Sequence, residues 1–581
     1  MKMKKVVLAA LNAKYIHSNL ALRYLSRFQD NNKKHNILTR EFTINQRLDF
    51  IAEELFRLHP DVILFSAYIW NVEMLRELCV VLKKILPDCI LGFGGPEVSY
   101  ESEAFLQENP SVDIVMRGEG EIVFSKLLGY FDHGTPSLEE IGSLTFRKDG
   151  KIISNIAEAP LDLALLPFPY DADFKDVENQ IIYYESSRGC PYQCGYCLSS
   201  VEQGVRFVPL EKVLPDLQRF LDANVNQVKF IDRTFNCKKS HAMAIWKYLH
   251  EHDNGVTNFH FEMTADHIDQ ETIDFLKTVR KGLFQFEIGV QSTNPHTIQA
   301  INRNVDFEKL SGIVKQIKAG GNIHQHLDLI AGLPHEDYES FGRSFNDVYN
   351  LEPEQLQLGF LKVLKGSMLH QKQKEFDIVY HDKAPYEVLT THMLPYEDTL
   401  RLKYIEEMVE TYYNSGKFLH TLDYLVPLYE SPFAFFEALS RFWLAEGCQY
   451  KSLSKIGLCD VLWSFVQKNE KVDLSRFQWA MKFDIALHEK PKKLPVWLTI
   501  GGNGQEYERI TAKLVQKYIP SYADAEKKVL IKHTYLDVFG DEEPKAILLD
   551  YGHRDLLGNA EYLVIPMEEV EELLRQENKK K

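Results

Sequence analysis

The first 135 residues alternate short apolar runs with longer amphipathic stretches, which is the pattern of a parallel sheet covered by helices. A helix is expected over residues 72–86, between two of the runs. Such sheets bind ligands at the carboxyl ends of their strands, where glycine-rich turns stand at residues 94–97 and 118–121. The pattern predicts an N-terminal Rossmann-like domain over residues 1–135. Its expected strands are residues 6–11, 61–66, 90–93 and 114–116.

A second alternation begins at residue 181 and contains six apolar runs with helical stretches between them. Six strand–helix units predict a partial (β/α)6 barrel over residues 181–375, with its chemistry at the carboxyl ends of the strands. Residues 136–180 read as a linker, in which Asp149 and Gly150 favour a hairpin turn and three prolines mark extended chain. The expected barrel strands are residues 181–184, 227–231, 259–263, 283–288, 325–330 and 354–360.

The pattern changes again after residue 376. Residues 397–475 are rich in Leu, Tyr, Phe and Glu at helical spacing, which predicts a mostly helical C-terminal domain over residues 376–570. Strand-like pieces follow at residues 529–538, 545–549 and 562–565. We expect this domain to cap the barrel mouth and to select the substrate. Its aromatic residues are expected to pack in a core rather than to line a ligand cage: Tyr412, Tyr413, Phe433, Phe435, Phe436 and Trp443.

Composition narrows the class of protein. A chain of 581 residues with 45% hydrophobic and 26% charged residues is typical of a soluble protein of several domains. The net charge of −16 disfavours a broad phosphate-binding surface, so nucleic acid is not an expected partner. The sequence has no apolar run of 18 residues and no signal-peptide cleavage pattern. We therefore expect a cytoplasmic protein without membrane association.

Three of the eight cysteines form a tight cluster in the spacing C-x3-C-x2-C: Cys190, Cys194 and Cys197. A 4Fe–4S cluster is held by cysteine thiolates, and three of them leave one iron open to a further ligand. A structural zinc site is the plain alternative, but zinc takes four ligands and no fourth Cys or His lies nearby in the sequence. The cluster therefore favours a 4Fe–4S centre with an open iron.

This motif, with an aromatic residue before its last cysteine and a (β/α)6 pattern around it, resembles the signature of radical S-adenosylmethionine (radical SAM) enzymes. The resemblance spans about residues 181–370. In that family, the cluster passes one electron to S-adenosylmethionine (SAM). The sulfonium bond then breaks, and the 5′-deoxyadenosyl radical takes a hydrogen atom from the substrate.

Further motifs carry the resemblance to the SAM contacts. Residues 289–292, Gly-Val-Gln-Ser, resemble a strand end of the branch that includes oxygen-independent coproporphyrinogen oxidases and methylthiotransferases. In that branch Gln291 would make a polar contact with SAM, Arg303 would contact the SAM carboxylate, and Asp328 would contact the ribose. The resemblance adds Glu262 as a polar contact, and Tyr184 and Tyr196 as flanks of the adenosyl group.

One position departs from the family pattern. The usual glycine pair after the second barrel strand, which receives the amino group of SAM, is absent. Asp232 or Thr234 stands there and could take that role.

The front domain resembles the cobalamin-binding domain that is fused to many radical SAM proteins. The resemblance implies cobalamin contacts at Ser66, Gly94, Gly95 and Glu97. The Asp-x-His-x-x-Gly stretch that supplies a lower axial histidine is missing, and His17 lacks that context. We therefore expect no histidine below the cobalt, and interpret His17 as an ordinary loop residue. A degenerate Rossmann-like domain without a cofactor is the alternative.

The chain as a whole resembles a subgroup of these proteins with an uncharacterised C-terminal domain, through residues 11–19, 70–71 and 94–97. The resemblance implies an enzyme with a 4Fe–4S cluster, SAM and cobalamin that methylates an unactivated centre of a small molecule. One alternative reaction is a cobalamin-dependent rearrangement or cyclisation. Another is RNA methylthiolation, which would need a second cluster, but Cys79 and Cys89 form no second cysteine triad. A further alternative is a non-enzymatic sensor protein. The expected partners are a small-molecule substrate and an electron donor such as flavodoxin or ferredoxin.

Overall fold

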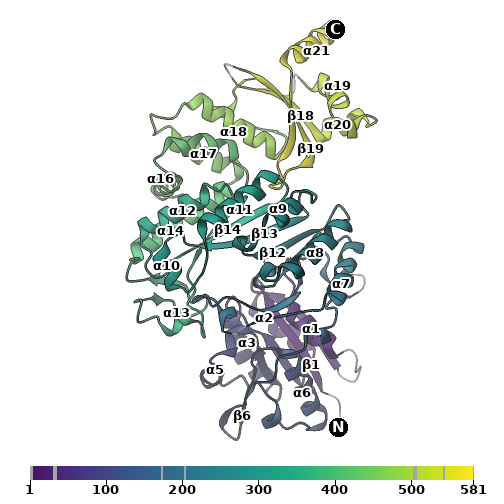
Figure 1. Ribbon diagram of the computed structural model, residues 1–581, viewed down its shortest axis with the longest axis vertical. Helices are drawn as coiled ribbons and strands as arrows, with labels where there is room; N and C mark the ends of the chain where they lie inside the picture. Colours follow the sequence, from purple (N-terminus) through teal and green to yellow (C-terminus); the bar gives the residue numbers. More distant parts are fainter. Residues whose placement is uncertain are drawn as a thin grey trace.

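A computed structural model describes residues 4–29, 36–171, 174–201, 204–501, 507–540 and 543–579. The molecule is elongated, with the N-terminal sheet at one end, a second sheet with its helices in the middle, and the C-terminal strands at the other end (Figure 1). In the described residues, no helix is both long and apolar enough to cross a membrane.

The front domain is a seven-stranded sheet in the order β2-β1-β3-β4-β5-β6-β7, parallel as far as β5. Helices α2, α3 and α5 cover one face and helices α1 and α6 the other, each with its own apolar core. The five parallel strands are β1 (Lys5–Asn12), β2 (Asn36–Thr43), β3 (Val62–Ser66), β4 (Ile90–Gly94) and β5 (Ile114–Met116). The helices are α1 (Leu20–Gln29), α2 (Leu48–Arg57), α3 (Val72–Ile85), α5 (Ser102–Glu108) and α6 (Gly120–His133).

A hairpin around Asp149 and Gly150 completes this sheet. Strands β6 (Leu144–Lys148) and β7 (Lys151–Ser154) pair antiparallel, and β6 also pairs with β5. The sheet of the front domain therefore continues into residues that the sequence pattern predicts as linker.

The middle of the chain is a six-stranded, all-parallel sheet in the order β15-β14-β13-β12-β11-β8. This order, with helices between successive strands, confirms the predicted partial (β/α)6 barrel. The strands are β8 (Ile182–Tyr184), β11 (Gln227–Phe230), β12 (Asn258–Met263), β13 (Phe284–Gln291), β14 (His324–Ala331) and β15 (Gln355–Phe360). The helices include α7 (Leu210–Asp222), α8 (Lys239–Glu251), α9 (Gln270–Leu276), α11 (Phe307–Gly320) and α12 (Tyr338–Tyr349).

Alternate residues of these strands face two different environments. Phe230, Phe261, Phe286 and Leu327 are buried in the core that the strands share with the surrounding helices. Because successive side chains of a strand point to opposite faces, the residues between them face the barrel lumen.

The C-terminal region is helical where it meets the barrel. Helices α14 (Tyr396–Met408), α15 (Leu419–Leu425), α16 (Pro432–Ala445), α17 (Lys455–Val466) and α18 (Leu474–His488) contribute to one core with the barrel. The predicted core role of the aromatic residues holds for Tyr412, Phe433, Phe435, Phe436 and Trp443, which are buried, and for Tyr413, which packs against them.

The chain ends in a smaller layered unit. Strands β18 (Thr534–Phe539), β19 (Lys545–Arg554) and β20 (Ala560–Ile565) form an antiparallel sheet. Helices α19 (Glu508–Tyr518), α20 (Lys527–His533) and α21 (Met567–Asn578) contribute to its core. The strand predicted over residues 529–538 is wrong in its first half, because residues up to His533 belong to α20.

Candidate functional site

The three clustered cysteines lie on one loop at the carboxyl edge of the barrel. Strand β9 (Ser187–Cys190) pairs antiparallel with β10 (Gly204–Phe207) and ends at the first of them. Gly189 has a φ of +96°, and a side chain there would meet the carbonyl oxygen of Gly204 at 2.1 Å. Only glycine fits this close pairing, so the backbone fixes where Cys190 leaves the strand. Cys194 is buried, and Cys190 and Cys197 are half-buried.

The second half of the loop is held by the barrel and by the segment after it. The amide of Gly195 donates to Ile301 O at 2.7 Å, and the amide of Leu369 donates to Gly195 O at 2.9 Å. A side chain at Gly195 would meet the end of Met368 at 2.2 Å. The glycine therefore lets helix α13 (Met368–Gln371) close over the loop.

The spacing of the sulfur atoms tests which metal group fits. The three sulfurs, all in described residues, do not lie within 4.8 Å of one another. Zinc–sulfur bonds of about 2.3 Å in a tetrahedron would hold them roughly 3.8 Å apart. The spacing thus disfavours a single zinc ion and suits a larger cluster with three thiolate ligands.

Arg303 links this loop to the Gly-Val-Gln-Ser strand end. Its Nη1 lies 3.6 Å from Cys194 Sγ and donates to Tyr196 Oη at 2.9 Å, while Nη2 donates to Gly289 O. Its Nε, like Gln291 Oε1, is buried without a hydrogen-bond partner among the described residues. A side chain at position 289 would overlap the Gln291 amide, at 2.2 Å. The predicted contacts Tyr196, Gln291 and Arg303 are thus brought together beside the cysteines, with unsatisfied polar atoms that a ligand would need.

Glu262 and Asp328 lie deeper, in the barrel lumen. Burial raises the pKa of Glu262 to about 6. Burial also raises the pKa of Asp328, although His326 opposes this shift. Asp328 Oδ1 lies 3.0 Å from His326 Nε2. Both carboxyl groups therefore belong to the lumen, and their predicted contacts with SAM stay a prediction.

Two predicted SAM contacts, Tyr184 and Asp232, already have other partners in this structure. Tyr184 points away from the lumen: its ring packs against Phe220 and Phe230, and its hydroxyl donates to Asp216 at 3.1 Å. Asp232 is 1% exposed, and both its oxygens already accept hydrogen bonds from Ser186 and Ser187. Thr234 is the better placed of the two candidates, since its Oγ1 lies 3.6 Å from Cys190 Sγ.

In the front domain, the predicted cobalamin contacts lie at the carboxyl edge of the sheet but differ in availability. Ser66 Oγ accepts from Asn19 Nδ2 at 3.3 Å. Gly94 ends β4, and a side chain at Gly95 would lie 2.5 Å from Ala67 O, so close backbone packing requires this glycine. The predicted contact Glu97 is buried and already accepts a hydrogen bond from the hydroxyl of Tyr386.

The same edge carries aromatic residues that sequence reasoning assigned no role. Tyr68 and Trp70 stack at 4.3 Å between ring centroids in the loop after β3, and Trp70 is 42% exposed. Tyr15, in the loop after β1, is 74% exposed. Their position after two parallel strands that are neighbours in the sheet was the available signal, and Tyr15 and Trp70 expose aromatic surface at this edge.

The second glycine-rich turn of the front domain holds the cysteine loop. Arg188, two residues before Cys190, donates through Nη2 to Glu121 at 2.6 Å and to Glu185 at 2.7 Å. Glu119 lies 3.3 Å from Arg188 and accepts from Arg206 of β10. The turn predicted as part of a ligand edge is therefore an ionic bridge between the two domains. Sequence spacing could not reveal it, because the partners are about 70 residues apart.

His17 is also part of the junction. Its Nδ1 lies 2.6 Å from Tyr183 Oη, and its backbone forms a parallel bridge with Ile181. The interpretation of His17 as an ordinary loop residue misses this contact, which joins the loop after β1 to the first barrel strand.

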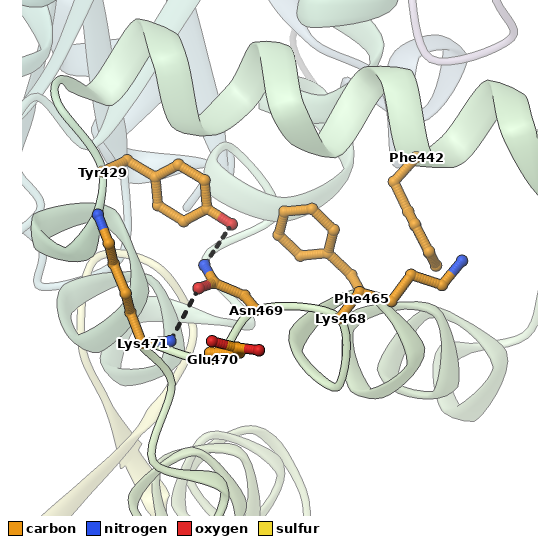
Figure 2. Close-up of a pocket in the computed structure, with 7 residues that line it drawn as sticks. All are labelled: Tyr429, Phe442, Phe465, Lys468, Asn469, Glu470 and Lys471. Atoms are coloured by element: carbon orange, nitrogen blue, oxygen red, sulfur yellow. Dashed lines mark hydrogen bonds between the residues drawn. The ribbon is translucent and has the colours of Figure 1, made fainter.

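The C-terminal region has a pocket of its own (Figure 2). It has a volume of about 500 Å³. Asn469 donates to Tyr429 Oη at 3.1 Å across it, and Lys468 lies 4.5 Å from the ring of Phe442. The pocket contains none of the predicted site residues, so it is separate from the cysteine loop and the lumen. Its lining is Tyr429, Phe442, Phe465, Lys468, Asn469, Glu470 and Lys471.

Three family models match the chain in sequence. Residues 6–128 match the B12 binding domain, residues 184–348 the radical SAM superfamily, and residues 374–546 a family described as a protein of unknown function (DUF4080). Fold and matches together define a chain with a B12-binding domain, a radical SAM domain and a C-terminal region of unknown function. The predicted cofactors are the ones these domain classes use: a 4Fe–4S cluster, SAM and cobalamin.

Individual proteins are similar over half of the chain or more. The chain is 24% identical to an uncharacterized methyltransferase, PH0819, of Pyrococcus horikoshii over 55% of this chain and 70% of that protein. It is 26% identical to the cobalamin-dependent radical SAM methyltransferase TokK of Streptomyces tokunonensis, over 54% of this chain and 49% of TokK. The fold resembles that of the cobalamin-dependent radical SAM enzyme OxsB, with a TM-score of 0.60 and 15% identity over 84% of each chain.

Proposed function

We propose that this protein cleaves SAM reductively at a cluster held by Cys190, Cys194 and Cys197 and transfers a methyl group, by way of cobalamin, to an unactivated centre of a small molecule. The observation that carries the proposal is the cysteine loop with Arg303 beside it, whose buried Nε and neighbouring Gln291 Oε1 lack partners. The methyltransferases among its relatives support the reaction type. Bound together, the cofactors supply an electron for SAM cleavage and a methyl group for transfer.

The chain's own residues would bind and orient SAM. Arg303 is placed to pair with the SAM carboxylate, because its guanidinium is fixed by Gly289 O and Tyr196 Oη next to the cysteine loop. Asp328 would accept hydrogen bonds from the ribose, and Gln291 would meet the adenosyl part. A one-electron donor such as flavodoxin or ferredoxin would serve the half-buried side of the loop. A small-molecule substrate is the proposed partner, and nucleic acid is not.

Anaerobic reconstitution with iron, sulfide and cobalamin tests the proposal. The expected results are an iron content near four per chain, 5′-deoxyadenosine on reduction with SAM, and a product heavier by one CH₂. Cys194→Ala should lose the iron and the 5′-deoxyadenosine, whereas Cys448→Ala, at a buried cysteine of the C-terminal region, should keep both. Zinc at the loop, or no 5′-deoxyadenosine, would end the proposal. A product without added mass would favour rearrangement or cyclisation.

A further inference from the structure

The barrel lumen contains a cluster of charged and imidazole side chains that the SAM contacts do not explain. Lys229 Nζ donates to Glu287 Oε2 at 2.9 Å and lies 3.8 Å from Glu262 Oε1. His260 Nε2 lies 3.0 Å from the same Glu287 oxygen. The ligand atoms of Glu287, His326 and Asp328 lie within 4.8 Å of one another.

Strand register explains how these side chains meet. Lys229 of β11 stands opposite His260 of β12, Glu262 opposite Glu287 of β13, and Glu287 opposite His326 of β14. In each strand, these residues occupy the alternate positions whose side chains face the lumen. Adjacent strands thus bring residues from four parts of the sequence into one polar layer below Asp328.

Parts of this layer are left unsatisfied. The side chains of His260 and His326 are only 9% and 8% exposed. Each Nε2 atom lies 3.0 Å from a carboxylate oxygen, of Glu287 for His260 and of Asp328 for His326, but outside hydrogen-bond geometry among the described residues. Buried polar atoms with incomplete hydrogen bonds are unfavourable, so a ligand that completes these bonds would bind more tightly.

The charges favour an organic ligand over a metal ion. A divalent cation would compete with the Lys229 ammonium, which already bonds to Glu287. Burial opposes protonation of His326, but the neighbouring Asp328 carboxylate outweighs it and raises the pKa of His326. The carboxyl groups of Glu262, Glu287 and Asp328 all belong to this part of the lumen. Such a group of acceptors suits a ligand with hydroxyl or amino donors, and an apolar ligand would leave it unpaired.

The layer also lies where the two cofactor domains meet. Tyr183, whose hydroxyl contacts His17 of the front domain, stands opposite Lys229 in the sheet. Asp328, the predicted ribose contact, borders the layer on the other side. A molecule bound here would lie between the SAM positions and the front domain.

We propose that Lys229, His260, Glu287 and His326 bind the substrate, and that this substrate is a small hydrophilic molecule with hydroxyl or amino groups rather than a lipid or a tetrapyrrole. The inference rests on the proposed function, because it assumes that the lumen holds the molecule on which the cofactors act. The four side chains fix its polar groups from strands β11 to β14.

Ligand capture tests this without turnover. Cofactor-loaded protein is incubated separately with aqueous and with chloroform–methanol extracts of the source cells, filtered, and its retained molecules are identified by mass spectrometry. The wild type should enrich a hydrophilic molecule at least about tenfold over Lys229→Met and Glu287→Gln, about 1.4 kcal/mol of binding. Lys281→Met and Glu271→Gln, at exposed ion pairs of the same barrel, are the matched controls and should capture as the wild type does.

The inference is overturned by capture of a lipid or a tetrapyrrole, by equal capture in the lumen variants, or by no enrichment at all. Iron content and the absorption spectrum of the cluster show that each variant is folded, and His326→Asn provides a third change. Adding SAM and reductant to the captured molecule separates the two proposals. A hydrophilic ligand converted without a mass gain supports the inference and contradicts methyl transfer, whereas a methylated lipid does the opposite.

Discussion

At the residue scale, hydrogen-bond satisfaction separates the cofactor positions from structural ones. Gln291 and Arg303 each keep a buried polar atom without a hydrogen-bond partner among the described residues. Both carboxylate oxygens of Asp232, in contrast, already accept hydrogen bonds. Ser292, in the same motif as Gln291, is structural, because its hydroxyl donates to Glu336 at 2.7 Å. Buried polar atoms are almost always paired in folded proteins, so the unpaired atoms of Gln291 and Arg303 beside the cysteine loop favour a ligand there.

Arg303→Lys should weaken SAM binding about tenfold, which corresponds to about 1.4 kcal/mol. A lysine cannot donate at once to Gly289 O and Tyr196 Oη and still present a fork to a carboxylate. Equilibrium dialysis of cluster-loaded protein with labelled SAM measures the change. Arg343→Lys, at an exposed position of α12, is the control. Unchanged affinity in Arg303→Lys would remove this residue from the SAM site.

Glu336→Gln should stabilise the barrel at pH 8 and have little effect at pH 5. Burial of Glu336 raises its pKa to about 7, despite hydrogen bonds from Ser292 and Ser344. Between the ordinary value of about 4.3 and about 7, the folded chain keeps a proton that the unfolded chain has lost, so wild-type stability falls as pH rises through this window. The gain from glutamine should reach on the order of 3 kcal/mol. Tm values at the two pH values measure it, and a gain independent of pH would contradict the assignment.

At this scale, a sequence does not show which face of a strand a side chain takes or which partner it finds. Tyr183 and Tyr184 are adjacent tyrosines, and only the sheet register decides that Tyr183 faces the lumen while Tyr184 faces the helices. The lumen residues Lys229, His260 and Glu287 were not predicted, because each is ordinary in its own strand. Cys190, Cys194 and Cys197 could be predicted, since their chemistry lies within one short loop.

At the scale of elements, buried strands were predictable and the polar edge strand was not. The six barrel strands differ from their predicted bounds by only a few residues, because each is a run with one fully apolar face. Strand β2 was missed: its sequence mixes Thr, Arg and Glu with apolar residues, and only Phe42 in it is buried. Edge strands need less apolar surface, so their pattern is weaker.

Arg188→Met should destabilise the junction of β9 with the front domain by about 3–5 kcal/mol, because it leaves buried charges without a partner. Glu121 and Glu185 are only 5% and 7% exposed and both accept from this guanidinium. Urea unfolding followed at the cluster absorption measures the loss. Arg57→Met, in an exposed ion pair of α2, is the control and should cost less than about 1 kcal/mol. A loss no larger than in this control would show that the ionic bridge does not hold the cysteine loop.

At the scale of the whole molecule, the front domain is tied to the rest of the chain at several separated places in the described residues. Three of them are His17 with Tyr183, the turn at Glu119 and Glu121 with Arg188, and Glu97 with Tyr386. The last pair joins α4 (Pro96–Ser99) to the segment between the barrel and the C-terminal helices. That segment also closes over the cysteine loop through Leu369. The carboxyl edge of the front sheet and the cysteine loop are therefore held by the same stretch of chain.

Tyr386→Phe should loosen this tie, and more at pH 8 than at pH 5. Burial raises the pKa of Glu97, and the Tyr386 hydroxyl opposes that shift by donating to the carboxylate. Without the hydroxyl, the folded-state pKa of Glu97 rises further, so the variant loses additional stability as pH rises above the ordinary value of about 4.3. The expected loss at pH 8 is about 1–3 kcal/mol, the cost of a buried acceptor without its donor.

Hydrogen exchange measures this loss, because exchange of α4 and β17 (Val388–Thr390) should accelerate together at pH 8 in the variant. Tyr396→Phe, whose ring is 51% exposed at the start of α14, should leave both elements unchanged. Equal acceleration at the two pH values would mean that the lost contact is packing of the ring, and that the Glu97 carboxylate has no part in joining the domains.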